Sequence, residues 1–239
     1  MFQTDPFMLI VLLVGLSLLP FVAMVATSYL KIVVVMSLIR NALGIQSIPP
    51  NMVINALAMI LTFYIMAPIM GESWGIVSAE MEKTRQAHVA HVTPGDPGAP
   101  GAAGGDGRWF ETDIIAKAAE PFRQFLSVQT SDRERAFFVK TAERLWAKNP
   151  DEPAAVDPES FFILIPSFCV SELSKAFQIG FLVYLPFIAI DIIISNILLA
   201  MGMMMVSPVT ISLPFKLLLF VMVNGWTLLI QGLIRGYAT

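Results

Sequence analysis

The sequence has little of the chemistry on which catalytic and metal-binding proteins rely. Its 239 residues include one cysteine, Cys169, and two histidines, His88 and His91. A single cysteine excludes an intrachain disulfide, and its apolar neighbours Phe168 and Val170 are typical of a buried thiol. The two histidines lie beside a glycine-rich stretch, and zinc sites normally need four ligands, so we interpret them as a solvated pair.

Motifs for nucleotide and acyl chemistry are absent too. The sequence has no phosphate-binding glycine loop and no nucleophile elbow, and its stretch HVTPGDPGAPGAAGGDG at 91–107 is not followed by the lysine and serine of a nucleotide site. We therefore expect no enzyme, no cofactor and no metal site, and no nucleic acid among the partners.

Charge is scarce and unevenly placed. Only 14% of the residues are charged, 56% are hydrophobic and the mean hydropathy is +0.72, whereas about a quarter of a soluble domain is charged. Of the 33 charged residues, 25 lie within 72–159. The other eight are Asp5, Lys31, Arg40, Glu172, Lys175, Asp191, Lys216 and Arg235. The chain thus consists of apolar segments, which need a non-aqueous environment, and one polar segment between them.

The apolar segments are long enough to form membrane helices. Uncharged stretches run over 6–30, 41–71, 192–215 and 217–234. A membrane-spanning helix needs about 20 apolar residues. No basic residue precedes the first stretch and Lys31 follows it, so we interpret this stretch as a retained helix and not as a secretory signal. The sequence predicts an all-α integral membrane protein of helical hairpins with a small polar helical insert.

The composition divides the chain into three segments. We expect an N-terminal hydrophobic helical hairpin at 1–71, a polar helical insert at 72–157 with a flexible Gly/Pro-rich loop at 91–107, and C-terminal hydrophobic hairpins at 158–239 with a Met-rich loop at 201–208.

Breaker residues place the ends of the first helices. Pro20 predicts a kinked or broken helix within 7–39. The double proline ending at Pro50 predicts a turn and then a helix that starts near Pro50 and ends near Gly71.

In the insert, apolar residues recur at helical spacing over 109–126 and 138–145, and Ser131 with Glu134 forms a capping-box pattern at the start of the second of these helices. We expect the next helix to open with Asp157 as its N-cap. The prolines expected to interrupt the second apolar half are Pro166, Pro186, Pro208 and Pro214.

Orientation follows from the basic residues in short loops. Lys31 and Arg40 lie between the first two apolar segments, and the charged stretch 72–159 that contains the insert carries 15 acidic against 10 basic residues. Basic residues mark the cytoplasmic side. We expect the insert to face away from the cytoplasm.

Four ionisable residues at membrane depth need partners, because each costs about 2.5–3.5 kcal/mol there. Glu172 and Lys175 share one helix face and can pair locally. Glu172 can instead pair with Lys216 of another segment or subunit. Asp191 with Asn196 can line a polar path, as in a transporter.

The methionine cluster is the most unusual feature of the sequence. Its members are Met201, Met203, Met204 and Met205. Methionine often fills gaps in a core, but the flanking Gly202 and Pro208 favour a loop. Such a loop, pointed at one axis by several subunits, would make a deformable seal.

Three segments carry long motifs. They read YLKIVVVMSLIRNALGIQSIPPN at 29–51, SELSKAFQIGFLVYLPFIAID at 171–191, and NILLAMGMMMVSPVTISLPFKLLLF at 196–220 followed by NGW at 224–226. They resemble the FliP/SctR family, the R component of the type III secretion export apparatus. The resemblance covers about 5–75 and 158–235, and the start of the chain almost directly on an apolar helix favours the injectisome branch.

The resemblance implies a pore-forming core subunit of the export gate, a multi-pass protein of the bacterial inner membrane with its insert on the periplasmic side. It implies about five copies of the chain, assembled with S and T components, in contact with membrane lipid and passing unfolded secreted proteins. The implied gasket is Met201, Met203, Met204 and Met205, the implied inter-subunit pair is Glu172 with Lys216, and Lys175 and Asp191 are further buried charges.

Two departures from the family pattern stand out. Asn224 replaces an acid that is common before Gly-Trp, and the Gly/Pro-rich loop resembles an insertion.

Two other function classes stay open. A secondary transporter or ion channel would use Asp191, Glu172 and Lys175 as a relay and would require an inverted repeat, which is not evident. A receptor would require an insert packed well enough to bind a ligand.

Overall fold

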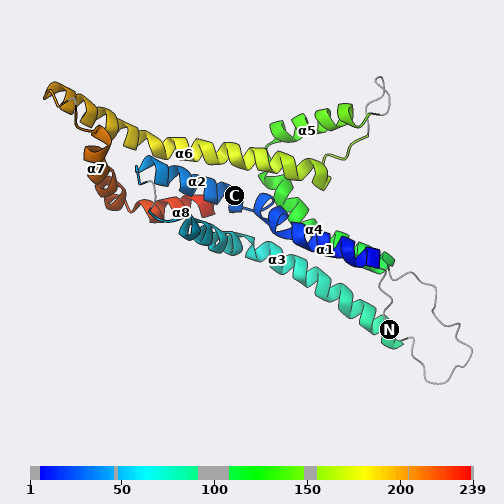
Figure 1. Cartoon of the computed structure of the whole chain (residues 1–239). Helices are drawn as coiled ribbons and strands as arrows, with labels where there is room; N and C mark the ends of the chain where they lie inside the picture. The colour runs from blue at the N-terminus through cyan, green and yellow to red at the C-terminus, as the bar shows by residue number, and fades with distance from the viewer. Residues whose placement is uncertain (1–5, 46–47, 91–107, 148–154, 204, 238–239) are drawn as a thin grey trace, which may run out of the picture.

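The computed structural model describes residues 6–45, 48–90, 108–147, 155–203 and 205–237. Within these ranges the chain forms helices and no strand, which confirms the all-α prediction (Figure 1). The helices are α1 (Pro6–Val25), α2 (Tyr29–Ala42), α3 (Asn51–Ala90), α4 (Arg108–Gln129), α5 (Asp132–Leu145), α6 (Phe161–Ala200), α7 (Pro208–Met222) and α8 (Gly225–Arg235). The loop predicted at 91–107 lies outside the described residues.

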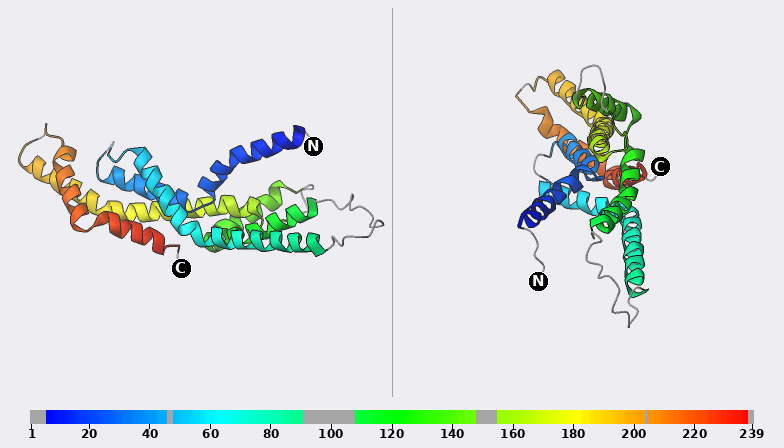
Figure 2. Two further views of the ribbon diagram at one scale, coloured as in Figure 1. Left: turned by 90° about the horizontal axis from the view of Figure 1, so that it is seen from below. Right: turned by 90° about the vertical axis from the view of Figure 1, so that its right-hand side faces the viewer.

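Two helices dominate the elongated shape of the molecule (Figure 2). Helices α3 and α6 have 40 residues each, so each is about 60 Å long at 1.5 Å per residue. That length is about twice the hydrocarbon thickness of a bilayer. Among the described residues, α3 over 51–83 and α6 are apolar enough to span a membrane, and the bent pairs α1–α2 and α7–α8 add up to two further spans.

The first apolar segment is broken, as predicted, but not at Pro20. That proline lies inside α1, and the chain bends by 55° between α1 and α2, at residues 26–28. At the bend the Thr27 hydroxyl donates to the Ala23 carbonyl over 2.6 Å. A side chain thus satisfies a carbonyl near the end of α1, where the backbone pattern stops.

The turn between α2 and α3 is held by one arginine. Gly44 has a φ of +76°, which glycine adopts without steric cost. Arg40 donates to the Pro49 carbonyl over 3.4 Å and also to the side chain of Asn51, the first residue of α3. The predicted helix start near Pro50 is confirmed.

Helix α3 does not end near Gly71. It continues to Ala90, and its polar second half packs on α4, where Lys117 pairs with Glu80 over 3.1 Å. The apolar hairpin and the polar insert therefore share one helix, because a change of composition does not by itself stop helix propagation. The division of the chain at residues 71 and 72 stays a prediction.

The two helices predicted in the insert are α4 and α5, and Ser131 is the N-cap of α5 as expected. The capping-box hydrogen bond is missing, however. The Ser131 amide donates instead to the Ser171 hydroxyl of α6 over 2.9 Å. A contact between helices thus replaces the local one and fixes the α4–α5 turn against α6.

The second apolar half departs from prediction at its start and at its prolines. Helix α6 begins at Phe161 with Ser160 as its N-cap, whereas Asp157 accepts the Glu159 amide in the preceding turn over 2.9 Å. Pro166 and Pro186 lie inside α6, and Pro214 lies inside α7; only Pro208, the first residue of α7, follows a break. Packed apolar helices tolerate proline, because neighbours can satisfy the freed backbone groups.

Helices α7 and α8 meet at a bend of 59°. Asn224 caps α8 there with a φ of 52°, a conformation that asparagine adopts more readily than most residues. This backbone requirement gives Asn224 a structural role in the bend between α7 and α8.

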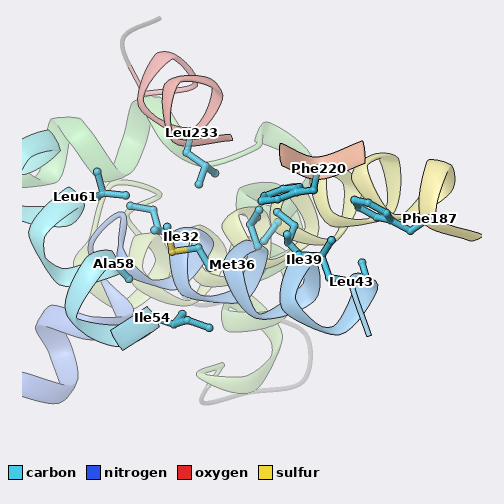
Figure 3. Close-up of a cluster of buried hydrophobic side chains, with 13 residues drawn as sticks. Ile32, Met36, Ile39, Leu43, Ile54, Ala58, Leu61, Phe187, Phe220 and Leu233 are labelled. Atoms are coloured by element: carbon cyan, nitrogen blue, oxygen red, sulfur yellow. The ribbon is translucent and has the colours of Figure 1, made fainter. Parts of the chain in front are cut away.

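Helix α2 forms the centre of the main core (Figure 3). Ile32, Val35, Met36 and Ile39 recur at helical spacing and are fully buried. They belong to one cluster with residues of α3, α6, α7 and α8, including Ala58, Phe187, Phe220 and Leu233. A smaller cluster around Leu126 and Phe168 joins α4 to α6.

Large apolar side chains cover much of the outer surface. Leu13 is 68% exposed, Phe181 62% and Val221 69%. Soluble monomers rarely expose apolar surface on this scale. Together with the two long apolar helices, this surface is that of an all-α membrane protein.

Replacing Gly180 with leucine is expected to destabilise the packing of α2 on α6. A Cβ at Gly180 would lie 2.3 Å from Leu38 Cδ1 and 3.2 Å from Leu38 Cβ. Overpacking of this kind costs about 1–3 kcal/mol, so the thermal unfolding midpoint in detergent should fall. The matched control is Gly71→Leu in α3, where a Cβ meets nothing within 4 Å; an equal fall in both variants would contradict the prediction.

Candidate functional site

Glu172 lies at the centre of a buried ion cluster. Its side chain is fully buried in α6. The carboxylate pairs with Lys31 of α2 over 2.9 Å and with Lys175, one turn along α6, over 3.0 Å. It also accepts the hydroxyl of Tyr237, which follows α8. Three separate parts of the chain therefore converge on one carboxylate.

Lys31 is as deeply placed as Glu172, with only 3% of its side chain exposed. Its ammonium lies 3.7 Å from the centroid of the Tyr237 ring, in cation–π contact. Burial, with the neighbouring Glu172, raises the pKa of Tyr237. The phenol therefore stays protonated and acts as a hydrogen-bond donor to the carboxylate.

The cluster is also joined to the insert. Lys175 donates to the Gln129 carbonyl at the end of α4 over 2.6 Å. A second contact is close by in the sequence: the Ser131 amide, two residues after Gln129, donates to the Ser171 hydroxyl, four residues before Lys175. The α4–α5 turn is thus attached to α6 at the level of the ion cluster.

A second charge pair joins α6 to α7. Lys216 contacts Asp191 over 2.6 Å and donates to the Ala42 carbonyl at the end of α2 over 3.3 Å. Ser212 donates to the other oxygen of Asp191 over 2.6 Å. Lys216 is 5% exposed and Asp191 35%, so this pair is more accessible than the Glu172 cluster.

The structure thus separates the two residues that the sequence pairs between subunits. Within this chain Glu172 and Lys216 each have another partner, and the local Glu172–Lys175 contact is present. A single chain does not test a contact between copies, so the Glu172–Lys216 pair stays a prediction. Asn196, considered with Asp191 for a polar path, is exposed.

Sequence reasoning missed Lys31 and Tyr237 as members of the cluster. Lys31 was interpreted as a loop residue that reports orientation, but it is buried in the first turn of α2. Its rarity among the apolar residues was the available signal, since a lone cation at that depth needs an acid. Nothing in the sequence singles out Tyr237.

The Met-rich turn connects α6 to α7 at one end of the elongated molecule (Figure 1). Helix α6 ends in a Schellman motif, in which the Met203 and Gly202 amides donate to the Leu198 and Leu199 carbonyls. Gly202 has the required positive φ of 73°. The predicted non-helical turn is confirmed.

The described methionines of this turn point outward. Met201 is 60% exposed, Met203 43% and Met205 completely exposed, and Met204 lies outside the described residues. A core-filling role would require burial. Within its own chain these methionines therefore form an apolar surface and do not pack in either buried cluster.

Replacing Asp191 with asparagine is expected to destabilise the chain by about 1–2 kcal/mol. The cost is modest because Asp191 is partly exposed, and because Lys216 keeps its contact with the Ala42 carbonyl. Chemical or thermal unfolding in detergent measures it, with Asp132→Asn at the exposed start of α5 as the control. A loss as large as that of a Glu172 variant would contradict the difference in burial.

Comparison with known proteins agrees with the motifs. The model of the FliP family matches residues 12–233. The chain is 45% identical over 233 residues to the Yop proteins translocation protein R of Yersinia pestis, covering 98% of this chain and 97% of the relative. It is 44% identical over 229 residues to the hypersensitivity response secretion protein HrcR of Ralstonia nicotianae, covering 96% of each chain.

A third relative extends the comparison. The chain is 43% identical over 234 residues to the virulence protein YscR of Salmonella typhimurium, covering 98% of both. The first two relatives are named for translocation and secretion and the third for virulence, and each match covers at least 96% of this chain. The chain belongs to the FliP family, in the injectisome branch of type III secretion proteins.

Proposed function

We propose that this protein is a pore-forming core subunit of the type III secretion export gate. In this proposal several copies surround one channel at the bacterial inner membrane, and unfolded proteins pass through it. The relatives support the system, since they are secretion and translocation proteins. The exposed methionine turn supports the position of the pore.

The methionine turn is the observation that carries the proposal. It projects from the junction of two helices, and Met205 is completely exposed. Methionine side chains are flexible and polarizable, so they can close around a narrow axis and deform when a chain passes. One turn seals nothing, but a ring of such turns at a common axis forms a gasket.

The outer surface supports assembly with copies of this chain and with the S and T components. Exposed apolar residues lie on both long helices, for example Phe63 on α3 and Phe181 on α6. Because each of these helices is longer than a bilayer is thick, lipid does not cover their whole length. Neighbouring subunits would bury the remaining apolar surface.

The proposed contact between copies pairs Glu172 of one subunit with Lys216 of the next. It requires an exchange, because Glu172 is held by Lys31 and Lys216 by Asp191 within this chain. Lys31 must keep Glu172 in this exchange, because Lys31 is 3% exposed and an isolated buried ion is costly. Lys175, which is 38% exposed, can give up its place on Glu172 to Lys216 of the neighbour, and Asp191, which is 35% exposed, can lose Lys216 at a smaller cost.

The insert, in this proposal, lies on the periplasmic side. Arg40 supports this orientation, because it lies in the last turn of α2, next to the short connection to α3 and at the opposite end of α3 from the insert helices. Attachment of the α4–α5 turn to α6 would hold the insert beside the gate.

The native mass of the protein, purified with co-expressed S and T components, tests this proposal. The expected result is a ring of about five copies that carries both partners. A control preparation without S and T shows whether the ring needs them. A monomer or dimer that binds neither component would overturn the proposal and favour a transporter.

A further inference from the structure

Tyr237 makes three contacts that together cover the ion cluster. Its hydroxyl donates to Glu172, its ring face lies over the Lys31 ammonium, and its ring stacks on Phe125 of α4 with centroids 6.1 Å apart. The Phe125 ring in turn contacts Phe168 of α6. One side chain after α8 thus touches three helices that are distant in sequence.

The attachment of Tyr237 to its own helix is short. After α8 the chain follows a single turn, in which the Gly236 amide donates to the Gly232 carbonyl over 3.1 Å and the Tyr237 amide to the Ile234 carbonyl over 3.0 Å. Arg235 and Gly236 beside it are exposed. Rotation of this one turn removes the phenol from Glu172 without unfolding α8.

We propose that Tyr237 is a latch that holds Glu172 in its intrachain pairing, and that assembly of the gate opens the latch. With Tyr237 closed, the carboxylate has three partners from its own chain and no exposed face. Opening removes the hydroxyl donor and uncovers the carboxylate for a cation of a neighbouring copy. This inference rests on the proposed gate function, because it assigns the step that frees Glu172 for the contact between copies.

The latch has a geometric consequence for neighbouring contacts. The same opening removes the aromatic cover from Lys31 and frees one face of Phe125. An uncovered cation and an exposed ring beside one another form a surface that only the open state presents. Assembly can therefore recognise the open chain, and the closed chain protects its buried charges before assembly.

Trypsin cleavage after Arg235 measures latch opening in the full chain. The protein carries an epitope tag after residue 239, is purified in detergent, and the loss of the tag is timed. Cleavage requires the turn after α8 to leave its folded position, so its rate follows the open population. Because a hydrogen bond to a charged group is lost, Tyr237→Phe is expected to raise the rate about tenfold. Tyr237→Ala, which also loses the ring contacts, should raise it further.

Cleavage after the exposed Arg144 of α5 is the internal control, and its rate should not change in either variant. Rates for Tyr237→Phe and Tyr237→Ala equal to that of the parent would overturn the latch. This comparison uses the unassembled chain, so its result does not depend on whether a gate forms.

The parent chain assembled with S and T components tests the second half of the inference. The expected result is cleavage after Arg235 at least about tenfold faster than in the unassembled chain. A complex that forms with an unchanged or slower rate would overturn latch opening while leaving the gate function in place. Failure of the complex to form would overturn the gate function, and assembly-driven opening with it.

Discussion

Replacing Glu172 with glutamine is expected to destabilise the chain by about 3–5 kcal/mol. The side chain is fully buried, and Lys31, which is 3% exposed, would be left as an uncompensated buried cation. Glutamine keeps the volume of the side chain, so the loss reports charge and not packing. Unfolding in detergent, followed by circular dichroism, measures the change.

Two variants separate the partners of Glu172. Lys175→Met removes the more exposed lysine, at 38%, and should cost much less than Glu172→Gln. Exchanging the charges of the buried pair, with Lys31→Glu and Glu172→Lys together, should recover part of the stability lost in Glu172→Lys alone. Recovery with Lys216→Glu in place of Lys31→Glu, in the unassembled chain, would contradict the intrachain pairing.

Deleting Met203, Met204 and Met205 is expected to leave assembly intact and to make the closed gate leak small solutes. The described methionines of the turn are exposed and belong to neither buried cluster, so the deletion removes no core packing. The proposed gasket depends on the turn, because these apolar side chains would fill the axis of the pore. Uptake of a small membrane-impermeant dye by cells that express the complex measures the leak.

Substitutions at the same positions provide the matched controls. Changing Met203 and Met205 to leucine keeps apolar volume and should keep the seal largely closed. Changing both to serine shortens the side chains and should reproduce the leak. Unchanged impermeability in both the deletion and the serine variant would exclude the gasket.

The helices were predictable because local signals dominate them. Hydrophobic stretches and the double proline before Asn51 predict where α3 begins, and glycine with proline predicts the turn at 201–207. The end of α3 was not predictable from composition, because α4 packs on its polar half and lets the helix continue past Gly71. The prediction that Pro166 and Pro186 interrupt α6 was wrong for a similar reason, because packing against neighbouring helices outweighs the helix-breaking tendency of a proline.

The candidate site was predictable in part. The rarity of charge identified Glu172, Lys175, Asp191 and Lys216 as residues that need partners, and all four have one. The partners themselves depend on tertiary contacts: α2 packs along α6 and brings Lys31 to Glu172, and α8 returns Tyr237 to the same point. No periodicity in the sequence records that convergence.

Site-specific photo-crosslinking to a stalled secretion substrate tests the central claim most directly. A photoreactive residue replaces Met205, which is completely exposed, or Phe162 at the start of α6, which is 81% exposed and lies far along the same helix from the turn. If the methionine turn lines the export pore, the unfolded segment of the substrate crosslinks to position 205 and not to position 162. Crosslinks at 162 with none at 205 would contradict the account.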